Sequence, residues 1–133
     1  MAEAKSLTTK RLVIGQVLVC QGCCCGAVDR GRPEVPTEWL KTEWRRRGLL
    51  KRLQLTISGC LGPCDVPNVV VIASETGADW YGHVTSREMY RDILDWASAS
   101  VAASRLLEVP KSFAGHSIEP FAKMWREPKG AFR

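Results

Sequence analysis

Short runs of apolar and β-branched residues recur along the chain and predict a β-sheet. Glycine, proline or polar residues bound each run, as expected for strands that end in turns. The third run is apolar at nearly every position, so we expect it to be buried on both faces. The turn letters ETGAD predict that the third and fourth strands form a hairpin. The four predicted strands are residues 11–19, 53–57, 68–74 and 80–84.

Two stretches with helical spacing of apolar residues lie between and after these strands. The first predicts a helix over 37–47. The second predicts a helix over 85–105, opened by a capping box in which Thr85 is the N-cap and Glu88 lies three residues later. The apolar stripe expected to face the core in this second helix consists of Met89, Ile93, Leu94, Ala97 and Val101.

The order of these elements predicts one α/β domain, a βαββα sandwich in which both cysteine-containing loops follow the carboxyl ends of strands. We expect a flexible N-terminus at 1–10, the domain at 11–107 and a C-terminal extension at 108–133. The extension is punctuated by proline and glycine but carries more aromatic residues than a disordered tail needs. These aromatic residues are Phe113, Phe121, Trp125 and Phe132.

Composition and hydropathy argue against a membrane protein and a secreted protein. With 133 residues, 45% of them hydrophobic, the chain suits a single modest core. It has no run of roughly 20 apolar residues, and Gln16 interrupts the apolar run that follows Lys10 and Arg11, so we expect neither a membrane span nor a signal peptide but a cytoplasmic protein.

The net charge of +5 comes partly from a basic cluster around the end of the first predicted helix. Such a cluster can attract nucleic acid or an acidic protein. It lacks the interleaved aromatic residues of a base-stacking surface, and we interpret it as a solvated helix end rather than a nucleic-acid site. Its members are Arg45, Arg46, Arg47, Lys51 and Arg52.

All six cysteines fall into two short segments, CQGCCCG from residue 20 and CLGPC from residue 60. In a cytosolic protein, clustered cysteines favour metal binding or redox chemistry over structural disulfides. Thiolates are soft ligands, and four of them suit zinc or an iron–sulfur cluster. The glycines in both segments let backbone amides approach sulfur closely.

The segment CLGPCDVPNVVVI resembles the C-L-G-x-C…P signature of thioredoxin-like [2Fe–2S] ferredoxins, which the small subunit of respiratory complex I shares. The resemblance covers roughly residues 11–104 and implies a thioredoxin-like fold. It implies that Cys20, Cys60 and Cys64 are cluster ligands. Cys25 matches the C-x4-C first pair of complex I subunits, with Cys24 or Cys23 as alternative fourth ligands. Stand-alone ferredoxins have a longer gap within the first pair, and this chain departs from that branch.

The longer run VCQGCCCG…GRPEVPTEWLK…LTISGCLGPCDVPN is similar to small (2Fe–2S) ferredoxin-domain proteins associated with cobalamin biosynthesis. This similarity implies a one-electron carrier without substrate turnover of its own. It implies a reductase and an acceptor as partners, the latter a flavoprotein or a cobalamin-pathway enzyme, and a homodimer. Because the chain remains basic after binding a cluster, we expect it to dock on an acidic face with strong salt dependence.

Two other interpretations of the cysteines remain open. Four thiolates also satisfy a structural zinc ion, although zinc pairs more often have C-x2-C spacing. Cys20 and Cys23 form a C-x-x-C pair after a strand, as in thiol–disulfide oxidoreductases, but no helix is predicted to begin there and the second cysteine segment is left unexplained. The two histidines, His83 and His116, are not placed for a Rieske-type cluster.

Overall fold

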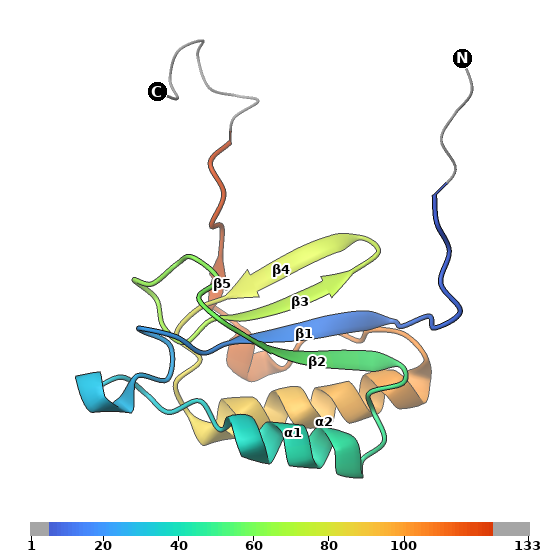
Figure 1. Ribbon diagram of the computed structural model, residues 1–133, viewed down its shortest axis with the longest axis horizontal. Helices are drawn as coiled ribbons and strands as arrows, with labels where there is room; N and C mark the ends of the chain where they lie inside the picture. The colour runs from blue at the N-terminus through green and yellow to red at the C-terminus, as the bar shows by residue number, and fades with distance from the viewer. Residues whose placement is uncertain (1–5, 124–133) are drawn as a thin grey trace.

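A computed structural model describes residues 6–123 of the chain as a mixed α/β fold with a five-stranded sheet and two α-helices (Figure 1). In chain order the elements are β1 (Gly15–Cys20), η1 (Val28–Arg30), α1 (Thr37–Arg46), β2 (Leu53–Ser58), β3 (Val70–Ser74), β4 (Gly77–Tyr81), α2 (Arg87–Ala103), η2 (Lys111–Phe113) and β5 (Ser117–Ile118). No helix within 6–123 is long and apolar enough to cross a membrane.

The sheet is mixed and has the strand order β2-β1-β3-β4-β5. Strands β1 and β2 are parallel, because α1 crosses over between them, whereas β3, β4 and β5 each run antiparallel to the preceding strand in the sheet. In the parallel pair Cys20 lies opposite Ser58, so β1 and β2 end side by side. The two cysteine segments therefore leave the sheet at the same edge.

Both helices cover the same face of the sheet, and the main core lies between them and the strands (Figure 1). Alternate residues of β1 and β2, such as Val17 and Leu53, point into this core, where they are fully buried. Trp44 of α1 is also fully buried, and its Nε1 donates to the carbonyl of Leu53 at 2.8 Å. On the opposite face, Trp80 packs against a smaller cluster that contains Val71, Cys20 and Cys25.

The four predicted strands and two predicted helices all exist, but several boundaries differ. Strand β1 begins at Gly15 rather than at residue 11, because β2 and β3 offer it partners only along 15–20. The predicted hairpin of the third and fourth strands is confirmed, but β4 spans Gly77–Tyr81, so the predicted turn at 75–79 and the predicted strand bounds of 80–84 are wrong. Ser74 pairs with Gly77, which leaves a two-residue hairpin loop.

The predicted capping box at the start of α2 is also wrong by one residue. Ser86, not Thr85, is the N-cap, and its Oγ accepts a hydrogen bond from the Met89 amide at 3.2 Å. Thr85 is exposed. The residues before the helix are held by other bonds, since the Val84 amide donates to the carbonyl of Asn68 at 3.0 Å.

We expect Ser86→Ala to lower the free energy of unfolding by about 1 kcal/mol, because the first turn of α2 loses its side-chain acceptor. Thr85→Ala is the matched control and should change it by less than about 0.5 kcal/mol, as exposed substitutions do. Urea denaturation of the two variants measures the difference. Equal losses in both variants would contradict the assignment of Ser86 as the cap.

Part of the predicted extension packs against the sheet and α2. Phe113 is buried and lies edge-on to Tyr81, with ring centroids 5.3 Å apart. Strand β5, which no sequence pattern indicated, pairs with the end of β4. Phe121 lies edge-on to Trp80 at 5.3 Å. The other two aromatic residues, Trp125 and Phe132, fall outside the described residues, as do positions 1–5 of the expected flexible N-terminus.

Candidate metal centre

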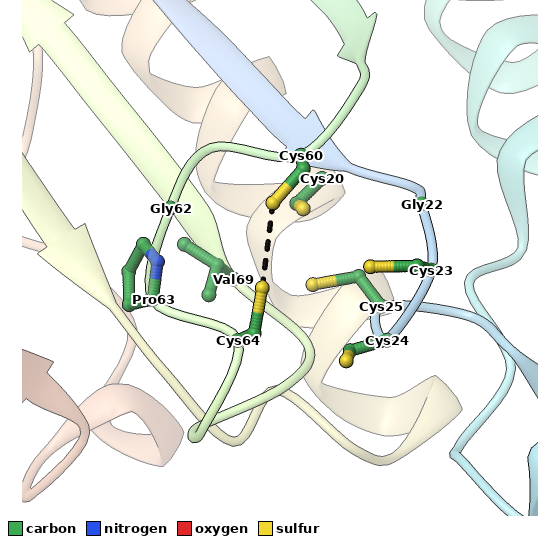
Figure 2. Close-up of a pocket in the computed structure, with 10 residues that line it drawn as sticks. All are labelled: Cys20, Gly22, Cys23, Cys24, Cys25, Cys60, Gly62, Pro63, Cys64 and Val69. Atoms are coloured by element: carbon green, nitrogen blue, oxygen red, sulfur yellow. Dashed lines mark hydrogen bonds between the residues drawn. The ribbon is translucent and has the colours of Figure 1, made fainter.

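The two cysteine segments form one recess at the edge of the sheet where β1 and β2 end (Figure 2). The recess is lined by all six cysteines together with Gly22, Gly62, Pro63 and Val69. A Cβ atom on Gly22 would lie 3.4 Å from the amide nitrogen of Cys60, so the two segments touch there. We call this space the cysteine recess.

The first segment is a tight loop held by its own backbone. The Gly22 amide donates to the carbonyl of Cys25 at 2.9 Å, and the Ala27 amide donates to that of Cys24 at 3.2 Å. Gly26 adopts a positive φ of 73°, which favours glycine. These contacts fold three successive cysteines, 23 to 25, into one turn, so their side chains fan out around the same recess (Figure 2).

The second segment turns at Gly62, whose φ of 122° is strained for other residues. The Cys64 amide donates to the Gly62 carbonyl at 2.7 Å, which closes the turn. As a result the sulfur atoms of Cys60 and Cys64 lie 3.4 Å apart (Figure 2). Sulfurs bound to one tetrahedral metal ion at about 2.3 Å are about 3.8 Å from each other, so this pair is spaced for a shared ion.

A buried asparagine that the sequence analysis missed holds the first segment in place. Asn68 is fully buried, and its Oδ1 accepts a hydrogen bond from the Gly26 amide at 2.8 Å. Its Nδ2 donates to the carbonyls of Pro33, Glu34 and Val84 at 3.1 to 3.3 Å. One side chain thus ties the cysteine loop and its exit to the start of α2. The only sequence signal was a polar residue beginning an apolar run.

The six sulfur atoms fall into three contact groups. Cys20 and Cys25 are buried and belong to one small apolar cluster with Val69 and Val71; we call these two cysteines the inner pair. Cys60, which is exposed, and Cys64, which is half-buried, are the outer pair. Cys23, Cys24 and Cys64 form a third group, the mouth trio, in which all sulfurs lie within 4.8 Å of one another. The structure therefore gathers every sequence-predicted ligand and both alternatives around one recess.

Burial and hydrogen bonding give these thiols different pKa values. Burial, followed by the hydrogen bond with Cys20, raises the pKa of the Cys25 thiol to about 12, although the Val69 amide acts in the opposite direction. In the outer pair, the hydrogen bond from Cys64 and then the Gly62 amide lower the pKa of Cys60. The same hydrogen bond raises the pKa of Cys64 to about 12. Backbone amides thus face one sulfur in each pair.

Alkylation of the metal-free, reduced chain should therefore be site-selective. At pH 7 we expect iodoacetamide to modify Cys60 at least about tenfold faster than Cys25, because Cys60 is exposed and forms a thiolate at lower pH, whereas Cys25 is buried with a raised pKa. Tandem mass spectrometry of quenched samples measures both rates. Full denaturation should abolish the difference, and equal rates in the folded chain would contradict the geometry.

The donor set around the recess fits a thiolate-bound metal centre. Within the described residues the recess offers six thiols and no imidazole. His83 is exposed, and His116 Nδ1 lies 2.9 Å from the carbonyl of Gly82 on the β5 side of the sheet. The inner and outer pairs supply four thiols, the ligand number of a [2Fe–2S] cluster or a structural zinc ion, and amide donors that stabilise thiolate charge.

The basic cluster lies at the opposite end of the sheet. It surrounds the end of α1 and the start of β2, whereas the cysteines follow the carboxyl ends of β1 and β2 (Figure 1). Part of its charge is paired, since Arg46 bonds to Glu43 at 2.7 Å and Arg47 to Asp95 at 3.0 Å. Its positive charge therefore does not border the cysteine recess.

Comparison of the chain with protein-family models and with curated proteins found no match.

Proposed function

We propose that the protein is a one-electron carrier that binds one [2Fe–2S] cluster through Cys20, Cys25, Cys60 and Cys64. The observation that supports this most directly is the convergence of two thiol pairs, an inner and an outer one, in a single recess. Such a cluster needs two pairs of thiolates, one pair for each iron. When bound, it supplies one-electron chemistry by alternating between ferric–ferric and ferric–ferrous states.

Different residues of the chain would hold the cluster, shield it from water and stabilise its charge. The inner pair, behind Val69, keeps water from one side of the site, and its burial favours a low-dielectric setting. The amides of Val69 and Gly62 face Cys25 and Cys60 and stabilise negative charge on these sulfurs. Asn68 fixes the loop that carries the inner pair. No residue is assigned to substrate turnover.

We propose that the scaffold is thioredoxin-like. The strand order β2-β1-β3-β4, with β1 parallel to β2, the next strands antiparallel and both helices on one face, supports this proposal. It also agrees with the resemblance of the CLGPC segment. The second thiol segment sits where function is common in α/β sheets, beyond the carboxyl ends of parallel strands.

The redox partner is expected to approach the outer pair, because Cys60 is the exposed ligand. The basic cluster is separated from this edge by the length of β1, roughly 17 Å at about 3.3 Å per residue. Since the Debye length is about 10 Å at 0.1 M salt, its attraction for an acidic partner is largely screened there. We therefore propose that the strong salt dependence of docking is confined to low ionic strength.

Anaerobic purification followed by iron, sulfide and zinc assays tests the proposal. We expect about two iron and two sulfide per chain, with visible absorption that fades on reduction by dithionite. A colourless protein with zinc alone would overturn the proposal in favour of a zinc-binding protein. A metal-free protein with a titratable disulfide would overturn it in favour of thiol–disulfide exchange.

A further inference from the structure

Two thiols in the cysteine recess exceed what a four-thiolate cluster requires. Cys23 and Cys24 lie at the open side of the recess, the first exposed and the second half-buried. Together with Cys64 they form the mouth trio, whose sulfurs all lie within 4.8 Å of one another. Figure 2 shows the side chain of Cys24 directed toward the second loop, whereas the Cys64 sulfur points toward that of Cys60. Three thiols this close together, two of them not needed for the cluster, form a candidate metal-binding site.

We propose that the mouth trio is a second, alternative binding site, sharing Cys64 with the outer pair, for a single thiophilic metal ion, Zn²⁺ or Cu⁺. Both ions accept thiolate ligands. At a metal–sulfur distance of about 2.3 Å, three sulfurs around one ion lie about 4 Å apart. The observed separations, at most 4.8 Å, need only small side-chain rotations to reach this value. Three protein ligands leave one position of a tetrahedral ion open to solvent, whereas structural zinc sites are closed by four protein ligands.

Hydrogen bonds to the backbone fix the loop that carries two of the three thiols. The carbonyls of Cys23 and Cys24 are already engaged, the first by the Arg30 guanidinium at 2.8 Å and the second by the Ala27 amide. The loop is thus held in place while the thiols remain free to turn. The positive charge of Arg30 also lies beside the loop that would carry two of the three thiolates, which offsets their mutual repulsion.

The shared ligand gives this site a regulatory consequence, which rests on the proposed function. Cys64 belongs both to the mouth trio and to the outer pair. A thiolate held by a zinc or copper ion in the trio is withdrawn from the ligand set of the cluster. Occupation of the trio therefore excludes cluster assembly, and the chain responds to the supply of thiophilic metal ions.

Two double variants of the full chain separate the sites. Cys23→Ser/Cys24→Ser removes two members of the trio and leaves both pairs. Cys20→Ser/Cys25→Ser removes the inner pair and leaves the trio. The metal-free, reduced proteins are titrated with Zn²⁺ against a chromophoric chelator, and with Cu⁺ under anaerobic conditions, after circular dichroism has verified their fold. Zinc-edge X-ray absorption then counts the sulfur ligands.

We expect Cys23→Ser/Cys24→Ser to weaken ion binding by about a hundredfold, and the inner-pair variant to change it by less than about threefold. X-ray absorption should show three sulfur ligands. The two titrations decide which ion the trio prefers. If the inner-pair variant loses ion binding and the mouth variant keeps it, or if four sulfurs are counted, the ion occupies the four-thiolate set and the inference is overturned.

Cluster reconstitution of the same variants reports on the proposed function separately. The mouth variant should take up two iron and two sulfide, and preloading the unaltered chain with Zn²⁺ should block that uptake. A mouth variant that binds no zinc but still assembles a cluster supports both proposals. One that keeps the ion but assembles no cluster contradicts the assigned cluster ligands and the alternative ion site alike.

Discussion

Asn68→Leu should lower the free energy of unfolding of the metal-free chain by about 4 kcal/mol, one of the largest effects expected from a single polar residue. Leucine has the same branched shape and is somewhat larger, so the substitution leaves no cavity and the main loss is that of the hydrogen bonds. The substitution leaves the Gly26 amide, which donates to Asn68 Oδ1 at 2.8 Å in the unaltered chain, without an acceptor. It also removes the amide group that donates to three backbone carbonyls. Urea denaturation measures the change, with one m-value used for the variant and the unaltered chain.

The matched control is Gln16→Leu, which removes one hydrogen bond to Thr56 at 3.0 Å on the helix-free face. It should cost about 1 kcal/mol or less. In the Asn68 variant, Cys25 should also become more accessible, so its alkylation rate should approach that of Cys60. A variant within about 1 kcal/mol of the unaltered chain, with Cys25 still protected, would show that Asn68 does not hold the cysteine loop.

The strand and helix pattern could be predicted because it depends on local spacing. The spacing of apolar residues in the run 53–57 and in the stripe of α2 can be recognised without knowing what these elements pack against. The hairpin was misplaced because its turn depends on pairing: Ser74 and Gly77 meet across a two-residue loop, which the letters ETGAD do not reveal. The cap of α2 was misplaced because Thr85 and Ser86 both suit the role, and the preceding backbone decides between them.

The location of the site could be predicted from the sequence, but which of its thiols are buried and which lie close together could not. A parallel β1–β2 pair places the ends of both strands together, so the meeting of the cysteine segments follows from topology. Which thiols are buried depends on the turn at Gly26 and on a hydrogen bond from a residue 42 positions away, Asn68. No local pattern carries that information. The same turn produces the mouth trio, which spacing alone did not indicate.

Replacement of the fourth ligand should remove the cluster altogether, and we expect Cys25→Ser to do so while Cys24→Ser and Cys23→Ser do not. Cys25 is buried beside Cys20 and faces the Val69 amide, so the two form one thiolate pair opposite Cys60 and Cys64. Cys23 and Cys24 lie outside this arrangement at the open side of the recess. Spacing left all three candidates open, whereas burial separates them.

Iron and sulfide assays after anaerobic reconstitution measure the result. Cys25→Ser should retain less than about a tenth of the iron of the unaltered chain, as should Cys20→Ser, whereas Cys24→Ser should retain nearly all of it. Because a buried serine can itself unfold the chain, Cys25→Ala serves as a second variant, and circular dichroism verifies that both remain folded. Full iron content in a folded Cys25→Ala chain, with loss in Cys24→Ser, would transfer the ligand role to Cys24. The inner pair would then be Cys20 with a residue of the mouth trio, and that outcome would also remove the alternative ion site.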